Sequence, residues 1–159
     1  MSEFIISRVF NASVDVIFEM WSDPKHVGQW LAPNGGKTHF KKAEIRAGGM
    51  SHYYIETPIG KMWGKIAYRE VQKPTKLVYV QSFSDENENI TRHPMMPNFP
   101  REMLTTVLFE DVGAKTKLTL TWVPINATAE EWAAFESAKG GMSQGWGGSF
   151  KQLDAYLTA

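Results

Sequence analysis

The side chains best suited to metal binding or acid–base catalysis, the histidines, are scattered along the chain. They stand at positions 26, 39, 52 and 93 and show no metal-ligand spacing such as His-Glu-X-X-His. His52 and Glu56 have the spacing of one strand face, but a single histidine on a strand is more often a surface residue than a ligand or a base. The sequence therefore predicts no metal site and no cofactor, and it assigns no catalytic residue.

The residue types present limit the remaining chemistry. Cysteine is absent, which excludes disulfides, thiolate catalysis and cysteine-based metal sites. Gly36-Lys37-Thr38 imitates the end of a phosphate-binding loop, but Leu31 stands where that motif needs its first glycine, and a strand rather than a helix is expected to follow. An acid or base isolated in a cavity needs no sequence motif, so general acid–base catalysis stays open as an alternative.

The element that would position a site is the C-terminal segment, which is predicted to be one long helix from Thr128 to Leu157. Thr128 and Glu131 form a capping-box pattern that starts it. Large apolar side chains fall on a single face of this helix: Trp132, Phe135, Met142, Trp146, Phe150, Leu153 and Leu157. Glycines stand at 140, 141, 145, 147 and 148, and each costs about 1 kcal/mol relative to alanine inside a helix. They indicate either a kink at Gly140-Gly141 or, as we favour, a smooth flank that a sheet, a partner or a ligand approaches closely.

The rest of the chain predicts one strand, two short helices and then a series of hairpin-linked strands. The predicted strands cover residues 4–10, 37–46, 50–56, 61–71 and 76–83, with two more on either side of residues 111–114. The short helices follow Asn11-Ala12-Ser13 and Asp23, and the second ends before Pro33-Asn34-Gly35-Gly36. Strands in series imply an antiparallel sheet, and only the terminal helix is long enough to cover its apolar face. The fold class is therefore α+β, with a curved antiparallel sheet of six or seven strands wrapped around one long helix.

The segment from Ser84 to Pro100 interrupts the strand series, and loops of this length tend to be functional or disordered. Its first half, with Asp85, Glu86 and Glu88, is expected to be a solvated hairpin tip. Its second half, Met95-Met96-Pro97-Asn98-Phe99, holds apolar residues of the kind that usually cover something. Two interpretations stay open, namely a flap over the open end of the sheet and docking against the protein's own surface.

Composition indicates one domain over residues 1–159 and gives no sign of a strongly charged partner. The chain holds 17 basic and 17 acidic side chains, so nothing steers it toward nucleic acid or anionic lipid. No apolar run reaches the about 20 residues that span a bilayer, and the first residues lack the pattern of a secretory signal. We therefore expect a cytoplasmic protein with neither nucleic-acid nor membrane partners.

A series of segments is specific in its order, although none of them is distinctive alone. They are RVFNASVDVIFEMWSDPKHVGQWLAP at 8–33, IRAGG at 45–49, YREVQKPTKLVYVQSFSDE at 68–86, KTKLTLTW at 115–122, and GMSQGW and SFKQLDAYL within 141–157. Together they span nearly the whole chain and resemble the heat-shock chaperone ATPase activator-like family. That family belongs to the START-like, or SRPBCC, superfamily of polyketide cyclases and birch-pollen-allergen-like proteins. Ser143 departs from the pattern, because an acidic residue is frequent at its position.

The resemblance implies the helix-grip fold, with a cavity between sheet and long helix that often takes an apolar small molecule. Candidate cavity residues come from the strands, the interrupting segment and the helix face: Tyr53, Ile55, Met62, Phe83, His93, Met96, Phe99, Met142, Gly145 and Trp146. The inward direction of the strand residues follows from alternation, which a shift of one residue would reverse. Core filling is the alternative use of Met142 and Trp146.

Three functions follow from these observations. The first is non-enzymatic binding of an apolar or aromatic small molecule in the cavity, with a Tyr or His to orient it. The second, which the resemblance implies, is a co-chaperone or stress-response interaction module that stimulates a heat-shock ATPase. The third is a cyclase- or hydrolase-type enzyme that uses an isolated acid or base in the cavity. An apolar ligand is the expected partner, and a chaperone is the alternative.

Overall fold

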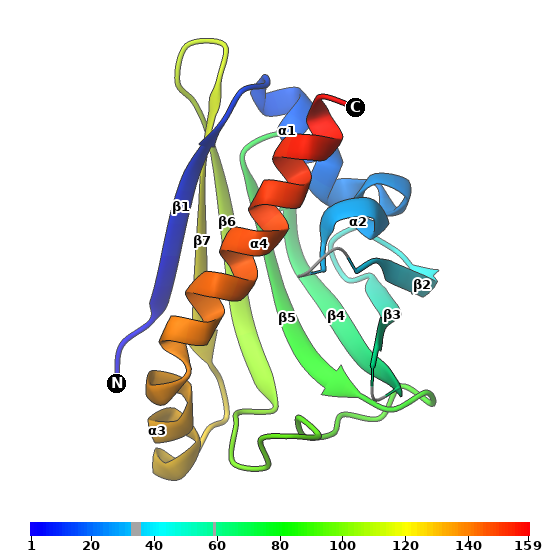
Figure 1. Cartoon of the computed structure of the whole chain (residues 1–159), viewed down its shortest axis with the longest axis vertical. Coiled ribbons are helices and arrows are strands. Elements are labelled where there is room, and N and C mark those ends of the chain that lie inside the picture. Colours follow the sequence, from blue (N-terminus) through cyan, green and yellow to red (C-terminus); the bar gives the residue numbers. More distant parts are fainter. Residues whose placement is uncertain (33–35, 59) are drawn as a thin grey trace.

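The strands form a single antiparallel sheet. The computed structural model describes residues 1–32, 36–58 and 60–159, and the predicted turns at 33–36 and 58–60 fall partly outside them. The strands are β1 (Phe4–Phe10), β2 (Thr38–Ala43), β3 (Met50–Thr57), β4 (Gly60–Gln72), β5 (Lys76–Ser84), β6 (Glu102–Asp111) and β7 (Thr116–Pro124). Their order in the sheet is β1-β7-β6-β5-β4-β3-β2, so β1 and β2 are the two edges. The predicted α+β architecture with a curved antiparallel sheet is confirmed, and it is a helix-grip fold (Figure 1).

Two short helices follow the first strand, as predicted. In α1 (Val14–Ser22), the Ser13 side chain accepts a hydrogen bond from the amide of Val16, which satisfies a free donor at the helix start. In α2 (Pro24–Trp30), the Asp23 side chain accepts from the amide of Lys25 in the same way. Trp21 and Trp30 are buried at 5% and 0% exposure, and their ring centroids lie 4.8 Å apart, so the two short helices are anchored by packed tryptophans.

The C-terminal segment forms two helices where the sequence predicted one. Thr128 and Glu131 make the predicted capping box at the start of α3 (Ala129–Ser137). The helix then breaks at Ala138, and α4 (Lys139–Leu157) begins without a side-chain cap. The break lies just before Gly140-Gly141, where a kink was the less favoured of the two interpretations, and glycines at a helix start have low intrinsic helix propensity.

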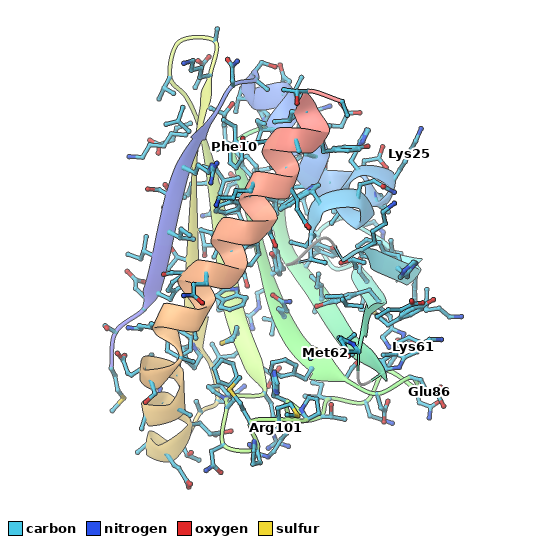
Figure 2. The ribbon with its side chains drawn as sticks, in the orientation of Figure 1. Phe10, Lys25, Lys61, Met62, Glu86 and Arg101 are labelled. Atoms are coloured by element: carbon cyan, nitrogen blue, oxygen red, sulfur yellow. The ribbon has the colours of Figure 1, made fainter. Side chains whose placement is uncertain are left out.

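The long helix α4 crosses the concave face of the sheet obliquely (Figure 1). Its apolar stripe is buried as predicted at Met142, Trp146, Phe150 and Leu153. Around the C-terminal half of α4 the core contains packed aromatic rings: Phe10, labelled in Figure 2, lies edge-on to Phe150 with ring centroids 5.5 Å apart. Within the described residues, no helix is both long and apolar enough to cross a membrane.

Candidate ligand-binding cavity

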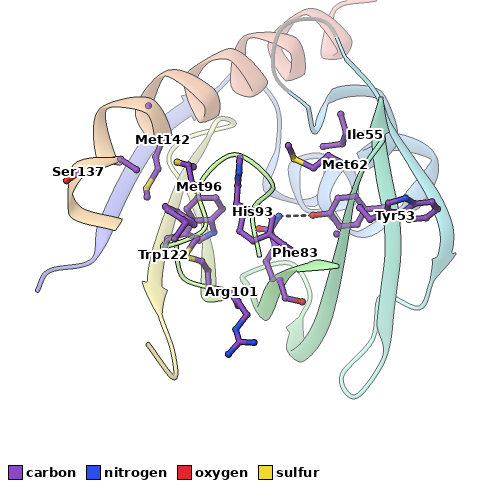
Figure 3. A pocket seen from close by; sticks show the side chains of 18 residues that line it. Tyr53, Ile55, Met62, Phe83, His93, Met96, Arg101, Trp122, Ser137 and Met142 are labelled. Atoms are coloured by element: carbon purple, nitrogen blue, oxygen red, sulfur yellow. Dashed lines mark hydrogen bonds between the residues drawn. The ribbon is translucent and has the colours of Figure 1, made fainter. Parts of the chain in front are cut away.

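A cavity of about 610 Å³ lies between the sheet, the segment from His93 to Arg101 and the start of α4 (Figure 3). Its walls come from β3, β4, β5, β6, β7 and the α3–α4 junction. A second cavity of about 190 Å³ extends toward the end of α2, along α4. The two cavities share part of their lining: Tyr53, Ile55, Gln81, Trp122 and Met142. The larger cavity has the size of a small-molecule site.

Glycines on α4 line part of this space and add no side-chain volume to it. Gly141 lines the larger cavity and Gly145 the smaller one. A Cβ atom added at either position would meet no heavy atom within 4 Å outside its immediate helical surroundings. The expectation that the sheet itself approaches this flank closely is therefore wrong. The approach of a ligand to the same flank stays a prediction.

On the sheet, Tyr53 carries the hydroxyl group that faces this space, and its ring lies across Gly64 on the neighbouring strand. A Cβ at Gly64 would stand 2.3 Å from both Cζ and Oη of Tyr53, so only glycine leaves room for the ring. The amide nitrogen of Gln81 donates to the Tyr53 hydroxyl at 2.9 Å. Burial raises the pKa of Tyr53, so the phenol stays protonated.

The second half of the segment between β5 and β6 closes one end of the cavity. His93, Met96 and Phe99 line it, while Met95 points outward at 68% exposure. Phe99 also packs on Phe83 and Phe135, with ring centroids 6.1 and 6.3 Å away. Both open interpretations therefore hold, since the segment covers the end of the sheet and docks on the protein's own core.

An ion pair ties this segment to α3. Arg92 donates through Nη1 to Glu131 Oε2 at 3.0 Å and to the Pro97 carbonyl at 3.1 Å. Glu131 is 7% exposed, and it also accepts from the amide of Thr128. Hydrogen bonding to that amide, together with Arg92, lowers the pKa of Glu131. The closed position of the segment is thus linked to the start of α3.

His93 is held in one tautomer by its own loop. The amide of Met95 donates to Nδ1 of His93 at 3.0 Å, so Nδ1 must be the unprotonated nitrogen of the neutral ring. Burial lowers the pKa of His93 below its ordinary value, which favours the neutral ring at physiological pH. The ring then carries its proton on Nε2, and it packs edge-on against Phe83 at 5.1 Å.

The first half of the segment is mostly exposed, as expected of a hairpin tip, but its backbone also contacts side chains on the sheet. Glu86 projects outward (Figure 2), but the Asp85 carbonyl lies 3.0 Å from His52 Nε2 and the Glu88 carbonyl accepts from Lys65. His52 is 3% exposed and stacks on Trp63 at 4.9 Å. The expectation of a surface position is wrong for this histidine, because alternation does not reveal that a loop covers the outer face of the sheet.

All of the predicted cavity residues lie at one of the two cavities. Only Gly145 and Trp146 line the smaller cavity alone; the other predicted residues line the larger one. Their role in binding stays a prediction. Sequence reasoning missed the polar residues Gln81 and Arg101 and the aromatic Trp122. Alternation on β7 places Trp122 with Leu118 and Leu120 on the inward face, and this signal could have identified it.

Two other groups have chemistry-bearing residue types but lie outside the cavity lining. Ser143 stands in a Gly-X-Ser-X-Gly sequence, yet it is an exposed residue inside α4, and a nucleophile elbow requires a strand-to-helix turn. Glu19, Asp23 and His26 place one ligand atom each within 4.8 Å of one another near the α1–α2 junction. His26 is also bonded to the Tyr156 hydroxyl at 2.7 Å, which connects α2 to α4.

A third recess of about 320 Å³ lies between the closing segment and α3. It shares Met96, Phe99, Ser137 and Ala138 with the larger cavity. The boundary between the two spaces is therefore made of loop and helix-junction side chains.

Comparison with known proteins gives a match to one protein family and several similar solved structures. Residues 11–158 match the family model described as Activator of Hsp90 ATPase homolog 1-like protein. No curated protein matches the chain. Protein Ms6760 from Mycobacterium smegmatis is similar in structure, with a TM-score of 0.79 at 23% identity over 99% of this chain and 91% of that one. A protein from Arthrobacter aurescens also has a TM-score of 0.79, at 25% identity over 98% and 86%. An AHSA1 protein from Silicibacter pomeroyi has a TM-score of 0.69 at 17% identity over 99% and 98%.

Proposed function

Because the chain belongs to the Activator of Hsp90 ATPase homolog 1-like family, we propose that it binds an apolar or aromatic small molecule between the sheet and α4, without catalysis. The observation that carries this proposal is the cavity of about 610 Å³ between the sheet and α4, which is larger than the gaps that side chains normally leave in a protein interior. Empty space of this size costs stability unless something fills it, because the atoms that line it lack contacts on one side. The proposal treats residues 1–159 as one domain with one site.

The lining combines mostly apolar walls with a few polar groups, as expected of a small-molecule site. Side chains such as Ile55, Met62 and Phe83 supply apolar walls, and burial of a ligand against them contributes about 25 cal/mol per Å². Met96 and Met142 are flexible and polarisable, so they adapt to the shape of a ligand. A few polar groups among these walls would fix its orientation.

The first test looks for a ligand that purifies with the protein. Native mass spectrometry of freshly purified protein, followed by solvent extraction, is expected to reveal a bound compound and its mass. A chaperone in the same spectra would instead favour a protein-interaction role. Protein that carries no compound, and that also fails to bind any apolar fluorescent probe, would contradict the proposal.

A matched pair of variants locates the site. Gly141→Leu would place a side chain in the larger cavity, whereas Gly140→Leu would place one on the adjacent residue, which is not part of the lining. Both added side chains start in space where a Cβ meets nothing within 4 Å, so both proteins should fold. We expect Gly141→Leu to weaken the affinity for the probe by about tenfold or more, because its side chain would fill part of the pocket. Gly140→Leu should keep the affinity unchanged. Equal affinities would place binding elsewhere.

The family description favours a second candidate, stimulation of an Hsp90-type ATPase. The measurement is the ATPase rate of a purified Hsp90-type chaperone with and without this protein. Stimulation that survives Gly141→Leu would assign the activity to a surface outside the cavity, and it would make co-chaperone function independent of ligand binding.

A further inference from the structure

We infer that the ligand of this cavity is an uncharged, largely apolar molecule that carries a hydrogen-bond acceptor, such as the carbonyl oxygen of an aromatic ketone. This inference rests on the proposed function and narrows it to a chemical class. Three features support it: the lack of acidic side chains in the described lining, the hydroxyl hydrogen of Tyr53 and the Nε2 hydrogen of His93, neither of which has an acceptor among the described residues.

The charge of the lining argues against ionic ligands. Among the described residues that line the two cavities there is no Asp and no Glu. A buried cation would therefore lose its hydration without gaining an opposite charge. The only Arg or Lys in this lining is Arg101, an exposed residue whose guanidinium points away from the other labelled side chains (Figure 3). An anion deep in the cavity would be equally unpaired, so a neutral molecule is favoured.

Tyr53 supplies the first donor. Its hydroxyl oxygen accepts from Gln81, and within the described part of the chain no residue accepts the hydroxyl proton. If the Gln81 amide is turned over, the Tyr53 hydroxyl donates to it and the amide hydrogens become free instead. In either orientation the Tyr53–Gln81 pair keeps a hydrogen that it can donate to a ligand. An unpaired buried donor is costly, and an acceptor on the ligand would remove that cost.

His93 supplies the second donor from a different element. The Met95 amide occupies Nδ1, so the neutral ring presents Nε2–H, for which the described residues offer no acceptor. His93 lines the same cavity as Tyr53 but belongs to the closing segment, not to the sheet. Trp122 contributes only its ring, because its Nε1 is fully buried away from the open space. The lining thus offers donors to a ligand from the sheet and from the closing segment.

A set of three related probes tests the class directly. The first is a neutral, environment-sensitive aminonaphthyl ketone, the second is its analogue with the carbonyl reduced to a methylene group, and the third carries a quaternary ammonium group. We expect the ketone to bind about ten- to hundredfold more tightly than the methylene analogue, which is the value of two neutral hydrogen bonds, one from each donor. We expect the ammonium probe to bind more weakly than both. Fluorescence titration gives the three dissociation constants, and the ketone emission reports hydrogen bonding at its oxygen.

Two variants connect this preference to the donors. Tyr53→Phe and His93→Phe each remove a donor and keep an aromatic ring, so each should weaken the ketone about three- to tenfold and leave the methylene analogue unchanged. The control is Tyr54→Phe, which removes a hydroxyl from the adjacent residue outside the cavity lining. Using two variants keeps the test decisive if one of them fails to fold, which circular dichroism would reveal.

The outcomes separate the two proposals. If the ketone and its methylene analogue bind equally, or the ammonium probe binds as tightly as either, the acceptor class is wrong while small-molecule binding stands. If Tyr53→Phe and His93→Phe both leave the ketone preference intact, the assigned donors are wrong. If none of the three probes binds, and no compound purifies with the protein, the proposed function fails and the inference fails with it.

Discussion

The space between α4 and the sheet is solid at one end and hollow at the other. At the solid end, Trp21 stacks on Trp146 with ring centroids 6.0 Å apart and packs edge-on against Trp30 at 4.8 Å. At the hollow end, the same helix and the same sheet enclose about 610 Å³. Trp146 is the boundary, because it belongs to the aromatic cluster and also lines the smaller cavity.

The difference arises from residue types along one helix. The first half of α4 is rich in glycine, while its second half carries Phe150, Leu153 and Tyr156. Two helices, α1 and α2, also cover the solid end, whereas a loop segment closes the hollow end (Figure 1). Interiors normally fill to crystal-like density, and a hollow bounded by glycines and flexible methionines is the feature on which the proposed site depends.

The largest effect should separate truncations at the two ends of α4. Phe150→Ala removes a ring at 1% exposure from the solid end and should lower the free energy of unfolding by about 3–5 kcal/mol. Met142→Ala removes a side chain that already faces empty space, so its cost should lie near the lower limit for such truncations, about 2 kcal/mol. Urea unfolding of both variants measures the difference. Equal losses would mean that the hollow end is occupied or collapsed in solution.

A smaller difference in stability is expected between two glycines, one beside a backbone atom and one beside a side chain. A Cβ at Gly28 would stand 2.8 Å from the Thr38 carbonyl oxygen, a backbone atom that cannot move aside. Gly28→Ala should therefore destabilise the protein by about 1–3 kcal/mol. At Gly64 the obstacle is the ring of Tyr53, which can swing into the cavity, so Gly64→Ala should cost less than about 1 kcal/mol.

The second glycine variant has a functional readout as well. A displaced Tyr53 loses its hydrogen bond to Gln81, so Gly64→Ala should reduce the preference for a ketone probe to the part contributed by His93, while Gly28→Ala should keep it whole. Thermal unfolding and probe titration on the same samples measure both quantities. A Gly64→Ala protein that keeps the whole ketone preference would show that the position of Tyr53 does not depend on Gly64.

The fold could be predicted because its signals are local. Ser13 and Asp23 mark helix starts through hydrogen bonds within one turn, and Thr128 with Glu131 does the same for α3. Period-two alternation of apolar residues also marks the buried face of β6 and β7. Each of these signals depends on neighbours in sequence, so one sequence was enough.

The site could be predicted only in part because its decisive contacts are between distant segments. The Gln81–Tyr53 bond joins residues on different strands, and the cover over His52 depends on how residues 85–91 fold back. The break at Ala138 depends on the balance between glycine propensity and packing, which periodicity does not measure. The apolar lining and the positions of Tyr53 and His93 were predictable, whereas the hydrogen bonds that these two side chains make, to Gln81 and to the Met95 amide, were not.

A third, smaller effect is an increase in stability when glycines on the other flank of α4 are replaced. A Cβ at Gly147 or Gly148 would meet no heavy atom within 4 Å beyond its immediate helical surroundings, and neither residue lines a cavity. Replacing either by alanine should raise the free energy of unfolding by about 0.4–1 kcal/mol, because the unfolded chain loses freedom and the helix loses its weakest residues. Gly145→Ala should stabilise by the same amount but reduce the smaller cavity. A loss of stability at Gly147 or Gly148 would mean that a partner or another segment contacts this flank.

The smallest effect concerns the closure of the hollow end at low pH. Folding lowers the pKa of Glu131 below its ordinary value of 4.5. Above pH 4.5 the carboxylate therefore contributes its full stabilisation to the folded state. This contribution is lost as the pH falls through the lowered pKa of the folded protein. Protonation also removes the charge that pairs with Arg92, so segment 93–100 should exchange amide hydrogens faster in acid while Phe150 at the solid end stays protected. Hydrogen exchange from about pH 7 to about pH 3 measures this, after correction for the intrinsic pH dependence of exchange.

Two variants serve as the test and its control. Glu131→Gln should remove most of the pH dependence of exchange in segment 93–100, whereas Glu130→Gln on the same helical turn should leave it unchanged. If the segment opens equally in all three proteins, the Arg92–Glu131 pair does not hold the cavity closed.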